Sequence, residues 1–148
     1  MTKPAGEFEF IGKMRLAQSS KVSKEMVQDA KRAGLDPREF VPQFAFGLRF
    51  GKSKFVMSVQ ASCGHYCEPR LTLNDFNKYE SFEVALFKDG GKSMWSAKKV
   101  LGDDSELAKM LDENYFKGKV FAYVPKEKVE LLYQAMQEKF GGCINNDN

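Results

Sequence analysis

Two stretches of the chain alternate between apolar residues and others, as a β-strand with one buried face does. The first covers residues 44–50, and residues 55–61 form the second. The short segment Gly51-Lys52-Ser53 separates them, and a Gly-containing connection of this length joins antiparallel strands. The pattern therefore predicts a β-hairpin over residues 44–61, whose apolar face needs a layer of helices to cover it.

The rest of the chain adds shorter strands and several helices. We expect strands at residues 82–87 and 120–124, with weaker signals at 7–11 and 94–95. Capping residues predict helices at 23–33 (Ser23 as N-cap, Gly34 at the end), from Asp36 to Pro42, from Asp104 or Ser105 to Asn114, and from Pro125 to Phe140. This order of elements indicates an α+β fold, a mostly antiparallel β-sheet of four to five strands covered by about three helices.

The apolar faces of these elements need one another for burial, so we expect them to share one core. The expected members are Phe44, Phe46, Leu48, Phe50, Phe55, Met57, Val59, Phe82, Val84, Leu86, Leu132 and Met136.

The length of 148 residues, with 43% hydrophobic and 29% charged residues, suits one globular domain. Within it we expect residues 1–43 to form an N-terminal helical element and residues 44–148 the α+β domain. No apolar run is long enough for a membrane span, and the N-terminus lacks the apolar core of a signal peptide. We therefore expect a cytoplasmic protein with no membrane partner.

Charge is spread unevenly. Residues 1–60 carry eleven Lys and Arg against six Asp and Glu, whereas residues 61–148 carry twelve against fourteen. A basic front half favours an anionic partner, which is either nucleic acid or an acidic protein surface. A solvated lysine-rich surface is the plainer interpretation of the same charges.

The segment Cys63–Arg70 contains the only histidine, His65, and two of the three cysteines. Cys63, His65 and Cys67 are all metal-ligand types. On an extended strand, however, the two cysteines would lie about 13 Å apart, too far to share one zinc ion or to form a disulfide. A turn at Gly64 would relax this argument, but the one remaining cysteine, Cys143, is far away in sequence. We expect no bound metal, no cofactor and unpaired thiols.

The signatures of nucleophilic enzymes are also missing. No G-x-S-x-G sequence is present, and neither papain-like nor caspase-like signatures surround the cysteines. The sequence therefore favours a protein that is not an enzyme.

Residues 62–78 form a long segment without clear periodicity, and loops of this length are usually functional or disordered. Tyr66, Arg70 and Phe76 are residue types enriched in binding hot spots or interface cores. We expect this loop to bind a partner, with Arg49, Lys52 and Lys54 on the hairpin adding electrostatic attraction to an acidic surface. The alternative is a structural loop packed on itself.

Several pieces of the chain resemble a group of small proteins encoded by bacteriophages and prophages. They are Phe55–Ser62, His65-Tyr66-Cys67 with Pro69-Arg70, Tyr79–Val84, Tyr123-Val124-Pro125 and the helix ending at Gly141-Gly142. The group supplies no catalytic residues that can be carried over. The resemblance implies a small non-enzymatic protein that binds and inhibits or modulates a host protein, a protein–nucleic-acid complex or a defence complex, as anti-CRISPR and other anti-defence proteins do.

Two other functions stay open at this point. One is direct nucleic-acid binding through the basic front half and exposed aromatic residues. The other is a zinc-binding module or enzyme centred on His65.

Overall fold

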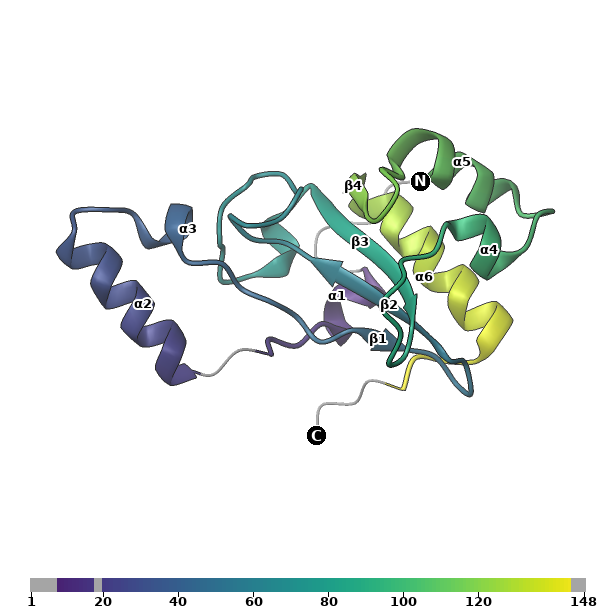
Figure 1. Cartoon of the computed structure of the whole chain (residues 1–148), viewed down its shortest axis with the longest axis horizontal. Coiled ribbons are helices and arrows are strands. Elements are labelled where there is room, and N and C mark those ends of the chain that lie inside the picture. Colours follow the sequence, from purple (N-terminus) through teal and green to yellow (C-terminus); the bar gives the residue numbers. More distant parts are fainter. Residues whose placement is uncertain (1–7, 18–19, 145–148) are drawn as a thin grey trace.

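The computed structural model describes residues 8–17 and 20–144 (Figure 1). They fold as predicted into an α+β protein, in which helices pack along one four-stranded antiparallel sheet. None of the helices in this described part of the chain has the length and apolar composition of a membrane-spanning segment.

The sheet contains β1 (Leu48–Arg49), β2 (Phe55–Gln60), β3 (Ser81–Lys88) and β4 (Phe121–Pro125), in that spatial order. On one face Met57 lies opposite Leu86 and Val59 opposite Val84, so cross-strand pairs bury the apolar positions. The strands near 82–87 and 120–124 are therefore confirmed, and of the predicted hairpin the antiparallel pairing of residues 48–49 with 56–57 is confirmed. The first strand, however, is only two residues long.

The helices are α1 (Glu9–Lys13), α2 (Ser20–Arg32), α3 (Pro37–Phe40), α4 (Ala97–Leu101), α5 (Glu106–Tyr115) and α6 (Lys126–Phe140), with a short 3-10 helix η1 at Phe76–Lys78. The side chains of Asp36 and Ser105 accept backbone hydrogen bonds at the starts of α3 and α5, as N-caps do. The last helix begins after Pro125 and ends at Gly141, as predicted.

Helix α6 provides the main cover of the sheet. Val129, Leu132, Tyr133 and Met136 recur at the helical period, are buried, and face the core where α6 packs on β3 and β4. Of the predicted core residues, Phe55 is half-buried and nine are buried: Leu48, Phe50, Met57, Val59, Phe82, Val84, Leu86, Leu132 and Met136.

Phe44 and Phe46 were predicted wrongly. Their side chains are 51% and 57% exposed, whereas Ala45 between them is buried. The backbone of the segment pairs with residues 15–17, through hydrogen bonds from Ala17 N to Phe44 O (2.8 Å) and from Phe46 N to Arg15 O (2.8 Å). It is bonded to β2 through the side chain of Gln60, which accepts from Ala45 N and donates to Ala45 O. Burial alternates with the predicted period of two, but before Gly47 the buried position is Ala45 and not its phenylalanine neighbours. A shift of one residue exchanges the two faces of a strand in this way.

Three weaker predictions were also wrong. The segment at 7–11 is helical from Glu9, because its apolar residues pack at helical spacing against α6 and the sheet. Ser23 lies inside α2, which begins at Ser20. Met94 makes a single bridge to Phe87 and no strand, and α4 begins three residues later at Ala97.

The N-terminal third is divided in space. Helix α1 belongs to the main core, where Phe10 packs edge-on against Phe82 at 5.3 Å. Helices α2 and α3 pack on each other at the end of the molecule farthest from α4 and α5 (Figure 1). Of the described residues before 44, those at 20–40 project from the body (Figure 1).

Candidate functional site

The loop of residues 62–78 is held at its base by two buried polar side chains. Gln43 donates from Nε2 to the carbonyl oxygen of Leu73 (3.0 Å). The Tyr79 hydroxyl donates to the carbonyl oxygen of Leu71 (2.6 Å) and accepts from the N–H of Leu73 (2.7 Å). Burial raises the pKa of Tyr79 to about 12, so the phenol keeps the proton that it donates.

Thr72 joins the same loop to the chain that follows α3. Its N–H donates to Arg38 O (2.8 Å), and its hydroxyl donates to Val41 O (2.6 Å) and accepts from Cys63 N (3.2 Å). These bonds define the backbone path of the loop, so the side chains that it presents have defined positions.

Tyr66 and Arg70 of the loop lie beside Tyr123 of β4, and we call these three residues the Tyr66 surface. The two tyrosine rings lie 5.9 Å apart, and both remain more than 40% exposed, at 44% for Tyr66 and 42% for Tyr123. The guanidinium of Arg70 lies 5.1 Å from the centre of the Tyr66 ring, within cation–π range. The cluster thus combines two exposed aromatic rings with a stacked cation.

The backbone around the Tyr66 surface fixes the relative positions of its rings. Tyr123 adopts a left-handed φ of 55°, and its N–H donates to the carbonyl oxygen of Tyr66 at 3.1 Å. The N–H of Tyr66 donates in turn to Glu83 Oε1 at 3.2 Å. The pairing of β3 with β4 is irregular between Phe82 and Val84. On β4 this irregularity falls between Phe121 and Val124, the stretch that contains Tyr123.

Ser62 and His65 close a buried turn before Tyr66. Ser62 Oγ lies 2.7 Å from His65 Nδ1 and accepts from the N–H of Gly64 at 3.1 Å. Burial is the main reason that the pKa of His65 is lowered, so the ring is neutral at physiological pH. Because the Ser62 side chain is fully buried, a substrate has no access to its hydroxyl. The pair therefore supports the loop, and Phe44 packs edge-on against the His65 ring at 5.2 Å.

The three cysteines are free thiols. Burial raises the pKa of Cys67 to about 11, so its sulfur is protonated, and Sγ donates to Ser62 O at 3.3 Å. The segment from Cys63 to Cys67 forms a turn. The separation of about 13 Å between these cysteines, which holds for an extended strand, therefore does not apply. In the described parts of the chain, 8–17 and 20–144, no three His, Cys, Asp or Glu side chains lie close enough to hold a metal ion.

Phe76 takes part in packing. It lies in η1, its ring is 6.2 Å from that of Tyr79, and it is half-buried against the core. The structure thus brings together Tyr66 and Arg70 from the predicted binding loop, with Phe76 at the base of that loop.

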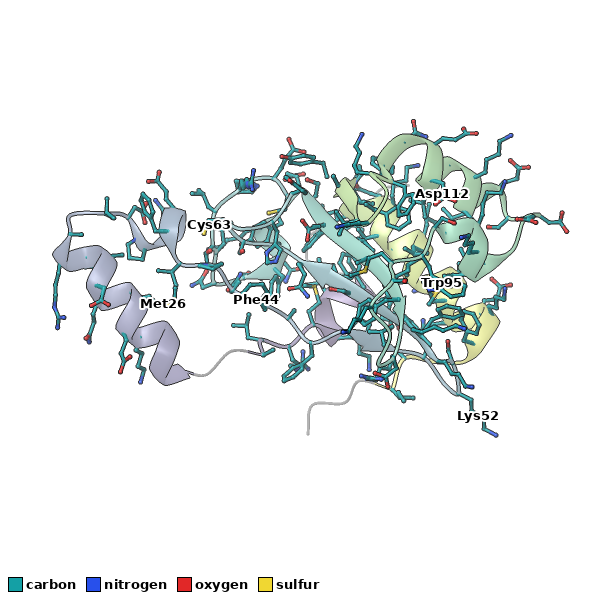
Figure 2. The ribbon with its side chains drawn as sticks, viewed as in Figure 1. Met26, Phe44, Lys52, Cys63, Trp95 and Asp112 are labelled. Atoms are coloured by element: carbon teal, nitrogen blue, oxygen red, sulfur yellow. The ribbon has the colours of Figure 1, made fainter. Side chains whose placement is uncertain are left out.

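Arg49, Lys52 and Lys54 lie at the opposite end of the sheet from this loop. Strand β2 leads from the hairpin turn at one end to the loop at the other, and Figure 2 shows Lys52 and Cys63 well apart. Arg49 pairs with Asp89 through two contacts of 2.6 and 3.1 Å, which lowers the pKa of the Asp89 carboxyl. The lysines therefore cannot share one compact interface with Tyr66, although they contribute to a pocket described below.

Tyr123 is the member of the Tyr66 surface that sequence reasoning missed. Tyr123 lies in a predicted strand, between the buried residues Ala122 and Val124. The sequence therefore gave no separate sign that its side chain belongs to an exposed cluster. The available hint was a single hydroxyl-bearing residue in the otherwise apolar stretch Val120–Val124 before Pro125.

Comparison with known proteins finds no matching family model, no matching curated protein and no matching solved structure. The function is therefore argued from the geometry of the sites.

Proposed function

We propose that this protein is a non-enzymatic binding protein that recognises another protein through the Tyr66 surface. The observation that carries the proposal is the exposed pair of Tyr66 and Tyr123, with Arg70 stacked on one ring. Tyr and Arg are the residues most enriched in hot spots of protein interfaces. The resemblance to phage proteins supports a host protein in the bacterial cytoplasm as the partner, which binding inhibits or modulates.

The positions of these residues favour tight binding. An interface loses free energy for every side chain that it immobilises, and tyrosine has only two side-chain torsions. Tyr66 and Tyr123 are already connected through the backbone and pack against each other, so little conformational freedom is lost when a partner covers them. Arg70 keeps its donors while it stacks, which suits a partner that presents a carboxylate beside an apolar patch.

Phe44 extends the same region with more apolar surface. It packs on His65, the residue before Tyr66, and Phe46 is exposed on the same inverted face of its segment. Phe44 therefore adds exposed apolar area beside the loop, and exposed apolar area is typical of an interaction surface.

A capture experiment from bacterial lysate tests the proposal. The tagged wild-type protein and the double variant Tyr66→Ala/Arg70→Ala are compared, with Leu131→Ala as a matched control because Leu131 is similarly exposed on α6. We expect the wild type and the control to retain a partner that the double variant loses, with all three equally folded in urea titration. A double variant that captures the same partner contradicts the proposal.

The same experiment separates the second function, direct binding of nucleic acid. Capture that survives nuclease treatment of the lysate supports a protein partner, and capture that disappears supports nucleic acid as the primary ligand. The observation that favours this second function lies at the other end of the molecule.

A further inference from the structure

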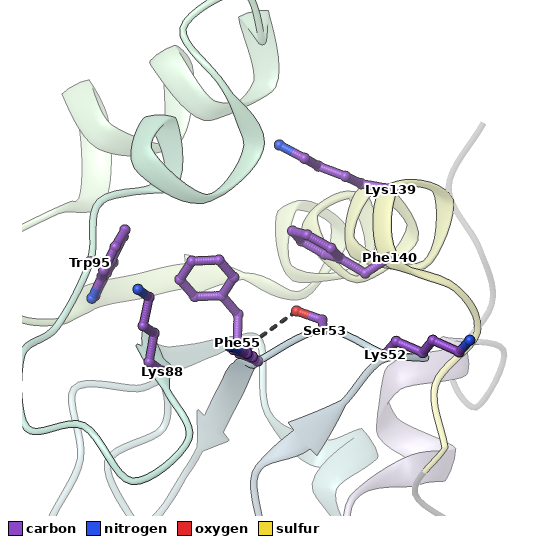
Figure 3. A pocket seen from close by; sticks show the side chains of 8 residues that line it. Lys52, Ser53, Phe55, Lys88, Trp95, Lys139 and Phe140 are labelled. Atoms are coloured by element: carbon purple, nitrogen blue, oxygen red, sulfur yellow. Dashed lines mark hydrogen bonds between the residues drawn. The ribbon is translucent and has the colours of Figure 1, made fainter.

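A pocket of about 510 Å³ lies where the β1–β2 turn, the end of β3, the segment before α4 and the end of α6 meet (Figure 3). Its volume falls within the range of about 300–1,000 Å³ that small-molecule sites occupy. Its lining consists of three aromatic rings, four lysines and Ser53.

Close backbone contacts hold the hairpin turn against the end of α6. Gly51 has a left-handed φ of 44°, and a Cβ atom there would collide with the carbonyl oxygen of Phe140. The N–H of Gly51 donates to Gly142 O at 2.9 Å. The turn that carries Lys52 and Lys54 is thus attached to the helix that carries Lys139, so the walls of the pocket have a defined separation.

The aromatic part of the lining consists of Phe55, Trp95 and Phe140. Figure 3 shows Trp95 on one side of Phe55 and Phe140 on the other. Ring centres are 5.0 Å apart for Phe55 and Trp95 and 5.9 Å apart for Phe55 and Phe140. All three rings are half-buried, so part of each faces the pocket. Such a surface suits a flat apolar group.

The charged part of the lining is entirely cationic. Lys52, Lys54, Lys88 and Lys139 line the pocket, and no carboxylate does. Lys88 Nζ lies 4.8 Å from the centre of the Trp95 ring, and Lys139 Nζ donates to the carbonyl oxygen of Val100 at 2.9 Å.

Two of the four lining lysines, Lys52 and Lys54, lie in the hairpin turn. In the part of the chain that the structure describes, neither Lys52 nor Lys54 pairs with a carboxylate. Asp89, which follows Lys88, has its carboxylate bound by Arg49. The hairpin side of the pocket therefore presents two lysine amines without a paired carboxylate beside apolar rings.

We propose that this pocket binds a nucleotide, with the base against the aromatic rings and the phosphate among the lysine amines. Aromatic stacking combined with lysine contacts to phosphate is the arrangement by which proteins hold single-stranded nucleic acid. A phosphate ion alone leaves the rings uncovered, and an acidic peptide without an aromatic group does the same. A free nucleotide and a nucleotide within a single strand share this chemistry.

This inference goes beyond the proposed protein-binding function and does not depend on it. The pocket and the Tyr66 surface lie at opposite ends of β2 and have no residue in common.

The chain provides its own probe, because Trp95 is its only tryptophan. Thymidine monophosphate, a thymidine oligonucleotide, inorganic phosphate and an Asp-rich peptide are titrated separately while tryptophan emission is recorded. Free N-acetyltryptophanamide corrects for absorption by the bases. We expect saturable quenching by the oligonucleotide, half complete at about 1–100 µM, the range of non-specific binding. Equal quenching by the monophosphate identifies a free nucleotide as the ligand, and quenching by the oligonucleotide alone identifies a strand.

Matched variants assign the quenching to the pocket. The double variant Lys54→Gln/Lys88→Gln removes two phosphate contacts, so we expect it to bind the oligonucleotide at least about tenfold more weakly. The slope of log affinity against log salt should fall by about 1.4, the value for two contacts to a single strand. Lys109→Gln, an exposed lysine on α5 that does not line the pocket, should leave both quantities unchanged.

Three results overturn the inference. The first is the absence of quenching by both nucleotide probes. The second is equal quenching by phosphate or the acidic peptide, which means that the pocket binds anions in general. The third is a Lys54→Gln/Lys88→Gln variant that binds the oligonucleotide like the wild type. None of these results bears on partner capture through Tyr66.

Discussion

Tyr123 donates its backbone N–H to the carbonyl oxygen of Tyr66 at 3.1 Å, and the two rings pack 5.9 Å apart. This connection joins the loop after β2 to the strand before α6. It requires the left-handed φ of 55° at Tyr123, a conformation that residues other than Gly, Asn and Asp rarely adopt. Strained backbone of this kind tends to persist at functional positions. The outward-facing tyrosine pair is therefore the feature of the fold that most needs a functional explanation.

The backbone at position 123 can be tested by stability measurements. Tyr123→Gly removes the ring but relieves the backbone, so the free energy of unfolding should change by less than about 1 kcal/mol. Tyr123→Val removes the ring and places a β-branched residue at positive φ, which should cost about 1–2 kcal/mol more. Urea titration of both variants measures the difference. Equal stabilities would mean that residue 123 is not left-handed in solution.

The revised core makes opposite predictions for two residues first assigned to it. Leu132 is buried between α6 and the sheet, so Leu132→Ala should cost about 3 kcal/mol. Phe46 is 57% exposed, so Phe46→Ala should change the free energy of unfolding by no more than about 0.5 kcal/mol. The comparison uses the urea midpoints of the two variants. A loss at Phe46 as large as that at Leu132 would restore the original placement of Phe46 in the core.

His65 predicts a specific dependence of stability on pH. Burial lowers its pKa in the folded protein below the ordinary value near 6.5, so the unfolded chain takes up this proton first as the pH falls. The free energy of unfolding should therefore decrease as the pH falls below about 7, and this contribution should level off below the folded pKa.

The control for this dependence is His65→Gln, since the chain has no other histidine. We expect the wild type to lose more stability than the variant between about pH 7.5 and about pH 5, measured by urea titration at each pH. Parallel curves for the two proteins would mean that the His65 ring is as accessible to protons in the folded state as in the unfolded state.

The sequence contains enough information for the sheet and its cover. Val59, Val84 and Leu132 lie on faces of the expected period, and burial of one face determines the register. The alternating pattern was not sufficient to predict which face of the strand Phe44 and Phe46 occupy. Their backbone pairs with the segment at 15–17, which the pattern did not predict. Tertiary contact also converts the alternating residues near Phe8 and Phe10 into a helix.

The candidate site was predictable only in part, for the same reason. Tyr66 and Arg70 are four residues apart in one loop, so their proximity follows from the sequence. The position of Tyr123 beside Tyr66 depends on an irregularity in the pairing of β3 with β4. The contact of Trp95 with Phe55 depends on a β-bridge at the end of β3. Neither contact has a local signature. Lys52 and Lys54 precede β2 and the loop follows it, so the length of this strand separates the two lysines from Tyr66.

Site-specific photo-cross-linking tests the central claim of a protein-binding Tyr66 surface most directly. The photoreactive residue p-benzoylphenylalanine replaces Tyr66, Tyr123 or, as an exposed control on α6, Leu131, and each variant is irradiated in nuclease-treated bacterial lysate. We predict the same cross-linked protein from positions 66 and 123, suppressed by excess unlabelled wild type, and none from position 131. A cross-link from position 131 alone, or none from positions 66 and 123, would contradict the account.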